Sequence, residues 1–199
     1  VDTCPGADVD FPALSRELFG KEYDPDSTWG EQRRVVVGHP SDDTVRKNGA
    51  SGGLTTALLL YLLKTGKIEG AGVVGMDPEY PSRPKAILAT TEEELRAAAK
   101  SKYTIVPSME VLSEMRKRKG PFAVVALPCQ IHGLRKMVKT DPALAGKVKY
   151  ILGLYCHYNM EPDGHLDCLR ALGIDPDEIA VFEFRGGGWP GGFRAVMKN

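Results

Sequence analysis

The stretch "FAVVALPCQIHGLRKMVK", Phe122–Lys139, decides the fold class of this chain. Its first part, "FAVVALP", is apolar throughout, which indicates a strand buried on both faces of a sheet. The second part, "CQIHGLRKMVK", starts directly after Pro128 and predicts a helix. A buried strand followed at once by a helix is typical of α/β proteins with a largely parallel sheet.

The same alternation extends through most of the 199 residues. Apolar or β-branched runs predict further strands: "RRVVVGHP" (33–40), "GAGVVGMD" (70–77), "PKAILAT" (84–90), "VKYILGLYC" (148–156) and the pair "AVFEFRG" (180–186) and "GGFRAVM" (191–197). Helices are predicted between them: "ALLLYLL" (57–63, a core helix), "TEEELRAAAK" (91–100), "MEVLSEMRKRK" (109–119) and "PDGHLDCLRAL" (162–172). We therefore predict an α/β domain over residues 31–199, with a mixed, largely parallel sheet and helices on both faces. Residues 1–30 predict a linker-like N-terminal arm with one short helix capped by Asp10.

Composition and charge exclude several classes of partner. Lys+Arg and Asp+Glu both number 26, so the net charge is zero, whereas nucleic-acid grooves and polybasic membrane patches need an excess of basic residues. The longest apolar run, Ala57–Leu63, is far shorter than the roughly 20 residues that cross a bilayer. We expect a cytoplasmic protein that binds no nucleic acid and has no membrane span.

Four cysteines, Cys4, Cys129, Cys156 and Cys168, are scattered without a C-x-x-C pair. Because there is no secretion signal, we expect reduced thiols or metal ligands rather than disulfides. Zinc is disfavoured because structural zinc sites usually bring their ligands in close pairs. Cys168 lies among leucines in "HLDCLRAL", and we expect it to pack in the core.

A glycine-rich loop precedes the most apolar helix, in "RKNGASGGLTTALLLYLLKTG", Arg46–Gly66. Glycines let a backbone approach a ligand closely, and the N–H groups of a helix's first turn favour an anion. Ser51 and Thr55 or Thr56 would add hydroxyl donors. The stretch matches neither G-x-G-x-x-G nor a P-loop, so a phosphate cradle and a plain helix start both remain open.

Two cysteines follow buried strands, in "LPCQIH" and "GLYCHYN". A thiol at the start of a helix, as predicted for Cys129, favours the thiolate, which attacks substrates or binds iron. His132 lies three residues on, along the same helical face. Cys156 and His157 are expected at the same edge of the sheet. The alternative is that Cys129 is a small buried group and His132 a surface residue.

Two further segments carry candidate ligand contacts. In "AKSKYTIVP", Lys102 could neutralise phosphate and Tyr103 could stack on a ring, although lysine and tyrosine in loops are usually surface residues. In "RGGGWPGG" (185–192), Trp189 stands among five glycines. This density indicates either a close approach to a planar group or, as we favour slightly, a wide hairpin turn.

Six segments, in order, resemble the coenzyme F420 hydrogenase/dehydrogenase beta subunit family: "NGASGGLTTALLLYLL", "IEGAGVVGMDPE", "SKYTIVPSMEVL", "ALPCQIHGLRK", "ILGLYCHYN" and "RGGGWPGG". The resemblance implies a flavoprotein, with FAD in the α/β domain, that passes electrons between [4Fe-4S] clusters and a hydride acceptor such as coenzyme F420. It also implies partners, namely a ferredoxin-like module or hydrogenase or dehydrogenase subunits.

The resemblance further implies roles for particular residues. The helix start at Gly52 and Gly53 would hold the pyrophosphate or ribose, and Lys102 and His157 would act as catalytic residues by stabilising charge on a reduced ring, a role His132 could also take. The expected FAD contacts are Asn48, Ser51, Gly52, Gly53, Thr55, Ser101, Lys102, Tyr103, Pro128, Cys129 and Gln130. The expected cluster ligands are Cys4, Cys129 and Cys156, which do not complete a set of four.

Both ends of the sequence predict further protein, and two alternative functions remain open. "TCPG" resembles the end of a ferredoxin motif, so the arm would follow a ferredoxin-like module, and the domain is expected to continue past residue 199. One rival is a cysteine enzyme with Cys129 as nucleophile and His132 or His157 as base. The other is a non-catalytic electron-transfer or docking subunit, which would bind no flavin.

Overall fold

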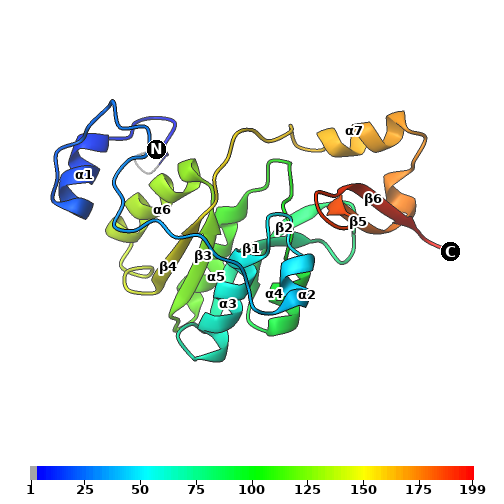
Figure 1. The fold of residues 1–199 in the computed structure, drawn as a ribbon, viewed down its shortest axis with the longest axis horizontal. Helices are drawn as coiled ribbons and strands as arrows, with labels where there is room; N and C mark the ends of the chain where they lie inside the picture. Colours follow the sequence, from blue (N-terminus) through cyan, green and yellow to red (C-terminus); the bar gives the residue numbers. More distant parts are fainter. Residues whose placement is uncertain (1–3) are drawn as a thin grey trace.

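A four-stranded sheet forms the centre of the computed structural model, which describes residues 4–199. Its order is β2-β1-β3-β4, with bounds β1 Gly70–Met76, β2 Pro84–Ala89, β3 Phe122–Ala126 and β4 Val148–Gly153. β1 pairs antiparallel with β2 and parallel with β3, and β3 pairs parallel with β4. The sheet, visible in Figure 1, confirms the predicted mixed and largely parallel α/β fold.

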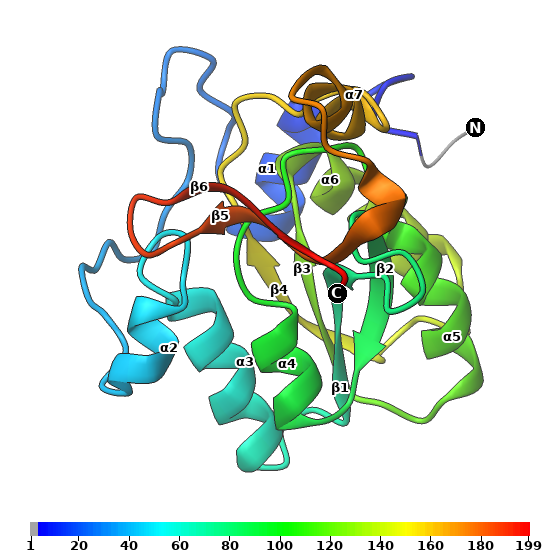
Figure 2. The ribbon, with the colours of Figure 1, turned by 90° about the vertical axis from the view of Figure 1, so that its right-hand side faces the viewer.

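Helices cover both faces of this sheet, as Figure 2 shows for α3 and α4 on one side of the strands and α5 on the other. The helices are α2 Asp43–Lys47, α3 Leu54–Lys64, α4 Glu92–Ala97, α5 Val111–Lys117 and α6 Pro128–Thr140. Strand β3 explains the two layers, because successive side chains of a strand point to opposite faces. Ala123 packs with α3 and α4, whereas Phe122 and Val124 pack with α5 and α6.

A smaller unit follows the sheet at one end of the molecule (Figure 1). It consists of α7 Gly164–Ala171 and the antiparallel strands β5 Ile179–Gly186 and β6 Gly192–Met197. Strand β5 turns Phe182 and Phe184 into a third apolar cluster with Leu166 and Leu169 of α7. The predicted strand pair is therefore confirmed. Short 3-10 turns lie at Ser108–Glu110 and Pro176–Glu178.

The N-terminal arm carries the predicted short helix, α1 Phe11–Phe19, and the Asp10 side chain caps it by accepting the Ala13 N–H at 2.8 Å. The arm lies on α6. Lys139 pairs with Glu17 at 2.7 Å, and the Phe11 ring meets the His132 ring edge-on at 5.2 Å. The described part of the arm is thus held against the α/β body at several points.

Three predictions about local structure are wrong. "RRVVVGHP" forms no strand, and the Val37 side chain is fully exposed, because β-branched residues favour a strand only where a neighbouring strand supplies hydrogen bonds. Helix α3 is buried on one face alone, since Leu54, Leu58 and Tyr61 are exposed. Cys168 is exposed rather than packed in the core, because it lies on the outer face of α7, opposite the buried leucines.

No helix within residues 4–199 combines the length and apolarity that a membrane crossing requires.

Candidate functional site

The loops that carry the candidate residues meet at one edge of the sheet. Segments 127–130 and 154–158 directly follow the parallel strands β3 and β4, and the Leu154 N–H donates to the Ala126 carbonyl at 3.0 Å. Helix α3 leads into β1 through a tight turn, so its N-terminus lies at the same carboxyl edge. This edge is where open α/β sheets bind ligands.

The glycine loop before α3 depends on two of its glycines for its own packing. Gly53 has φ of +73°, and a Cβ there would lie 2.3 Å from the Val45 carbonyl oxygen. A Cβ on Gly49 would lie 2.2 Å from the Gly53 nitrogen. The loop is therefore folded tightly onto α2. Among residues 4–199, no side chain caps the first turn of α3. Its N–H groups are therefore available to a ligand, and Asn48 and Ser51 are exposed beside them.

Lys102 is held by backbone oxygens rather than exposed at the surface. Its Nζ donates to the carbonyls of Ala98, Ala99 and Lys100 at 2.5, 2.7 and 2.9 Å. Burial, and secondarily the charge of Lys100, lowers the pKa of Lys102 to about 7. The neighbours Ser101 and Tyr103 are half-buried. Lys102 thus fixes the segment that carries Tyr103 onto the end of α4.

Arg185 connects three of the segments quoted from the sequence. From β5, its Nη1 donates to the Tyr103 hydroxyl at 2.8 Å, and its Nη2 donates to the Ala50 carbonyl at 3.1 Å. Its Nε donates to the Pro190 carbonyl. Sequence reasoning missed this residue. A signal existed, since Glu183 and Arg185 alternate with Phe182 and Phe184 on a strand whose other face is core.

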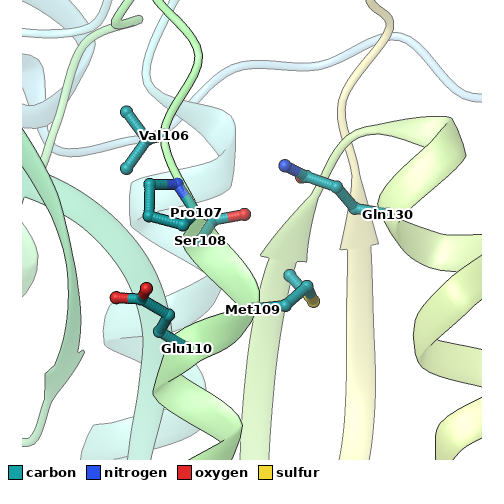
Figure 3. A pocket seen from close by; sticks show the side chains of 6 residues that line it. All are labelled: Val106, Pro107, Ser108, Met109, Glu110 and Gln130. Carbon is teal, nitrogen blue, oxygen red and sulfur yellow. The ribbon is translucent and has the colours of Figure 1, made fainter. Parts of the chain in front are cut away.

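A cavity of about 220 Å³ opens beside the carboxyl end of β3 and is lined by Val106, Pro107, Ser108, Met109, Glu110 and Gln130. Figure 3 shows the Gln130 side chain reaching from α6 toward the segment that carries Ser108. The Gln130 Oε1 accepts the Leu127 N–H at 2.9 Å, which leaves its amide nitrogen to donate elsewhere. The Ser108 hydroxyl is buried and has no hydrogen-bond partner among the described residues.

Cys129, Cys156 and His157 lie in the segments after β3 and β4. Cys4, Cys129 and Cys156 are all exposed, and His157 is exposed and meets the Tyr158 ring edge-on. His132 contacts the arm through Phe11. Within residues 4–199, no group of three or more His, Cys, Asp or Glu side chains is placed to hold a metal ion.

The arrangement suits an elongated ligand better than a compact one. The cavity is open to solvent and smaller than the roughly 300–1,000 Å³ of most small-molecule sites, so it leaves room for a ring or a fragment but not for a whole dinucleotide. The glycine loop and Arg185 offer N–H donors to an anion, and the continuous segment from Tyr103 to Glu110 joins them to the cavity. Pro128 and Thr55, exposed and half-buried respectively, lie at the starts of α6 and α3.

Known proteins are similar to this chain in sequence and in fold. The coenzyme F420 hydrogenase subunit beta of Methanothermobacter thermautotrophicus is 37% identical over 136 residues, covering 65% of this chain and 48% of that protein. The coenzyme F420-dependent sulfite reductase of Methanocaldococcus jannaschii is 36% identical over 155 residues, covering 70% of this chain and 24% of the reductase.

A solved structure of the F420-reducing [NiFe] hydrogenase complex from Methanosarcina barkeri contains a chain with the same fold. The TM-score is 0.63 at 25% identity, with 80% of this chain and 58% of that chain covered. This chain spans about half the length of the hydrogenase relative, and less of the reductase. Residues 35–113 match the N-terminal model of the coenzyme F420 hydrogenase/dehydrogenase beta subunit, and residues 120–199 match its C-terminal model. On these matches and the shared fold, the chain belongs to the coenzyme F420 hydrogenase/dehydrogenase beta subunit family.

Proposed function

We propose that this chain is the FAD-binding part of an oxidoreductase subunit that passes electrons between an iron–sulfur centre and a hydride acceptor such as coenzyme F420, in the cytoplasm. The observation that carries the proposal is the meeting of the glycine loop, Tyr103, Arg185 and the Gln130 cavity at one edge of the sheet. The relatives named for coenzyme F420 support the choice of acceptor.

The donor set fits FAD. Asn48, Ser51, Gly52, Gly53 and Thr55 would hold the nucleotide end, where α3 begins without a side-chain cap. The unpartnered Ser108 hydroxyl and the Gln130 amide nitrogen would meet the polar edge of a ring in the cavity. Bound FAD supplies a ring that exchanges electrons singly or as hydride. The chain's own residues bind it, orient it and exclude water.

The other candidate residues and the predicted iron–sulfur cluster have different support. Lys102 stays a candidate for stabilising negative charge, although its three carbonyl contacts give it a positioning role in the segment of Ser101 and Tyr103. His157 is exposed and free to contact a partner or acceptor. The cysteines do not fit a [4Fe-4S] cluster by themselves, since the described residues offer no group of three ligands. We therefore propose that the cluster lies with a ferredoxin-like module or a hydrogenase or dehydrogenase subunit.

The test is a flavin titration followed by an acceptor assay. The protein, purified without oxygen, is expected to show or regain a flavin absorbance band on adding FAD. With an added chemical reductant it should bleach the visible absorbance of coenzyme F420, and with an added electron acceptor it should restore the absorbance of the reduced coenzyme. A matched pair of variants sharpens the test. Gln130→Leu removes an amide that faces the cavity and should weaken flavin binding, whereas Lys119→Met changes an exposed residue beyond the C-terminal end of α5 and should not.

Each outcome distinguishes the rivals. A protein that binds no FAD under any condition would overturn the proposal and favour the non-catalytic docking subunit. Turnover without flavin that is abolished by alkylation of Cys129 would favour the cysteine enzyme. FAD binding with no exchange with coenzyme F420 would keep the flavin site and reject the acceptor.

A further inference from the structure

Within the described residues, Arg185 donates hydrogen bonds only to neutral groups. Its acceptors are a tyrosine hydroxyl and the backbone carbonyls of Ala50 and Pro190. Among residues 4–199 no carboxylate lies within ion-pair distance of its guanidinium. By contrast, Arg194 on the neighbouring strand β6 pairs with Glu183 at 3.0 Å. Within the described residues, Arg185 therefore has no ion-pair partner for its positive charge.

The charges near Arg185 on β5 also add up to an excess of positive charge. Glu183 is the carboxylate nearest to Arg185 along β5, and it is already shared by Lys100 and Arg194. Two cations on one carboxylate leave a net positive charge, to which Arg185 adds another. Cations that outnumber their anionic partners, here with Lys100 mostly buried and Arg194 exposed, favour an anionic ligand electrostatically.

The geometry also leaves donors unused. A guanidinium has five N–H donors in a planar fork that suits phosphate oxygens. Three of the five are engaged, one each from Nε, Nη1 and Nη2. The remaining two belong to Nη1 and Nη2. These contacts also lock the orientation of the fork before any ligand arrives.

We infer that Arg185 is an anion-binding residue that holds the diphosphate of the dinucleotide next to the glycine loop. This rests on the proposed function for the identity of the dinucleotide. In the same contacts Arg185 preorganises the loop at Ala50 and the ring of Tyr103, so a ligand meets donors that are already in place. Arg185 thus adds a fixed charge to the contacts expected from the sequence.

The experiment compares the protein with Arg185→Gln and with the control Arg170→Gln, whose charge is matched by Asp167 on the exposed face of α7. FAD affinity is measured by flavin fluorescence, and inorganic pyrophosphate is tested separately as a stabiliser in thermal unfolding. We expect Arg185→Gln to weaken FAD binding by about ten- to hundredfold, the range of one charge-assisted hydrogen-bonded contact. Pyrophosphate should raise the melting temperature of the wild type and of Arg170→Gln but not of Arg185→Gln.

A phosphate-free probe separates charge from loop positioning. Riboflavin carries the ring without the diphosphate, so its affinity should change much less than that of FAD in Arg185→Gln. Equal losses for both flavins would overturn the inference and leave a structural role. Unchanged FAD affinity would overturn it as well.

Failure of the inference and failure of the proposed function are distinguishable. If the wild type binds no FAD but pyrophosphate stabilises it in an Arg185-dependent way, the flavin proposal falls and the anion site stands. If Arg185→Gln does not fold, as judged by circular dichroism, Arg185→Lys takes its place. Lysine keeps the charge but not the fork, so a smaller loss of pyrophosphate stabilisation than of FAD affinity is expected, and no loss of either would reject the assignment.

Discussion

Lys102 is a residue on which burial and hydrogen bonding act in opposite directions. Removal from water disfavours the ammonium and lowers the pKa of Lys102 to about 7. The carbonyls of Ala98, Ala99 and Lys100 accept its three N–H groups and favour the charged form. Lys102 therefore changes its protonation close to neutral pH, and the free energy of unfolding should depend on pH as a result.

Replacing Lys102 by methionine should remove one component of the pH dependence of stability. The unfolded chain keeps this proton up to a pKa of about 10.4, so between pH 7 and 10 the unfolded state binds more protons and the free energy of unfolding rises with pH. Relative to Lys102→Met, the wild type should gain at least about 1.4 kcal/mol over that range, the value of one pKa unit. Urea unfolding at both pH values measures it, and the exposed Lys119→Met should show no such difference.

His165 shows the same principle on the acid side. Its side chain is 1% exposed, its Nε2 lies 2.8 Å from the Ser82 carbonyl, and its ring stacks near Phe182 and Phe184. Burial lowers the pKa of His165 against the opposing effect of Asp163 and the Ser82 carbonyl. Below the ordinary pKa of histidine, the unfolded state therefore takes up the proton first.

Stability should consequently fall as the pH drops from 7 toward 5, and His165→Phe should reduce that fall. Phenylalanine keeps the aromatic packing while removing the titration. The measurement is chemical unfolding of both proteins at the two pH values, and the exposed His157→Phe serves as the control. An equally steep acid dependence in His165→Phe would assign the effect to other groups.

At the scale of elements, the sequence predicted most strands and helices because their apolar patterns are local. β1, β3 and β4 were recognisable from continuous apolar runs. The Val35–Val37 run was not a strand, since strand formation depends on a partner that local sequence does not reveal. The role of Arg185 was not predictable from the sequence for a related reason. Its three acceptors lie up to 135 residues away in sequence, and no spacing rule brings them together.

The glycine loop offers a matched pair of substitutions at this scale. Gly52 and Gly53 both have positive φ, +83° and +73°, but a Cβ on Gly52 meets nothing within 4 Å, whereas one on Gly53 meets the Val45 carbonyl. Gly52→Ala should cost about 1 kcal/mol for the backbone conformation alone. Gly53→Ala should cost a further ~1–3 kcal/mol for the forced shift of α2 against α3. Thermal and urea unfolding compare the two, and equal losses would show that the loop relaxes freely.

At the scale of the whole molecule, apolar packing, ion pairs and hydrogen bonds join the α7–β5–β6 unit to the body. Met76 and Tyr103 pack against its apolar cluster, Arg83 pairs with Asp163 at 2.9 Å, and Lys100 pairs with Glu183. The proposed flavin site lies across this junction, because Arg185 belongs to the smaller unit and Ala50 to the body. The attachment of the unit therefore bears on ligand binding as well as on stability.

Glu183→Gln should loosen the smaller unit more than the sheet. The carboxylate is mostly buried, with its side chain 22% exposed, and neutralising it leaves Lys100 and Arg194 without their shared partner. Amide hydrogen exchange in β5 and β6 should accelerate by about tenfold, equivalent to one charge-assisted hydrogen bond, while β1 and β3 keep their protection. Asp167→Asn, which breaks the exposed Asp167–Arg170 pair on α7, should change little because surface ion pairs contribute little. Uniform acceleration across both units would instead mean that they unfold together, and Glu183 would then stabilise the molecule as a whole rather than hold one part to the other.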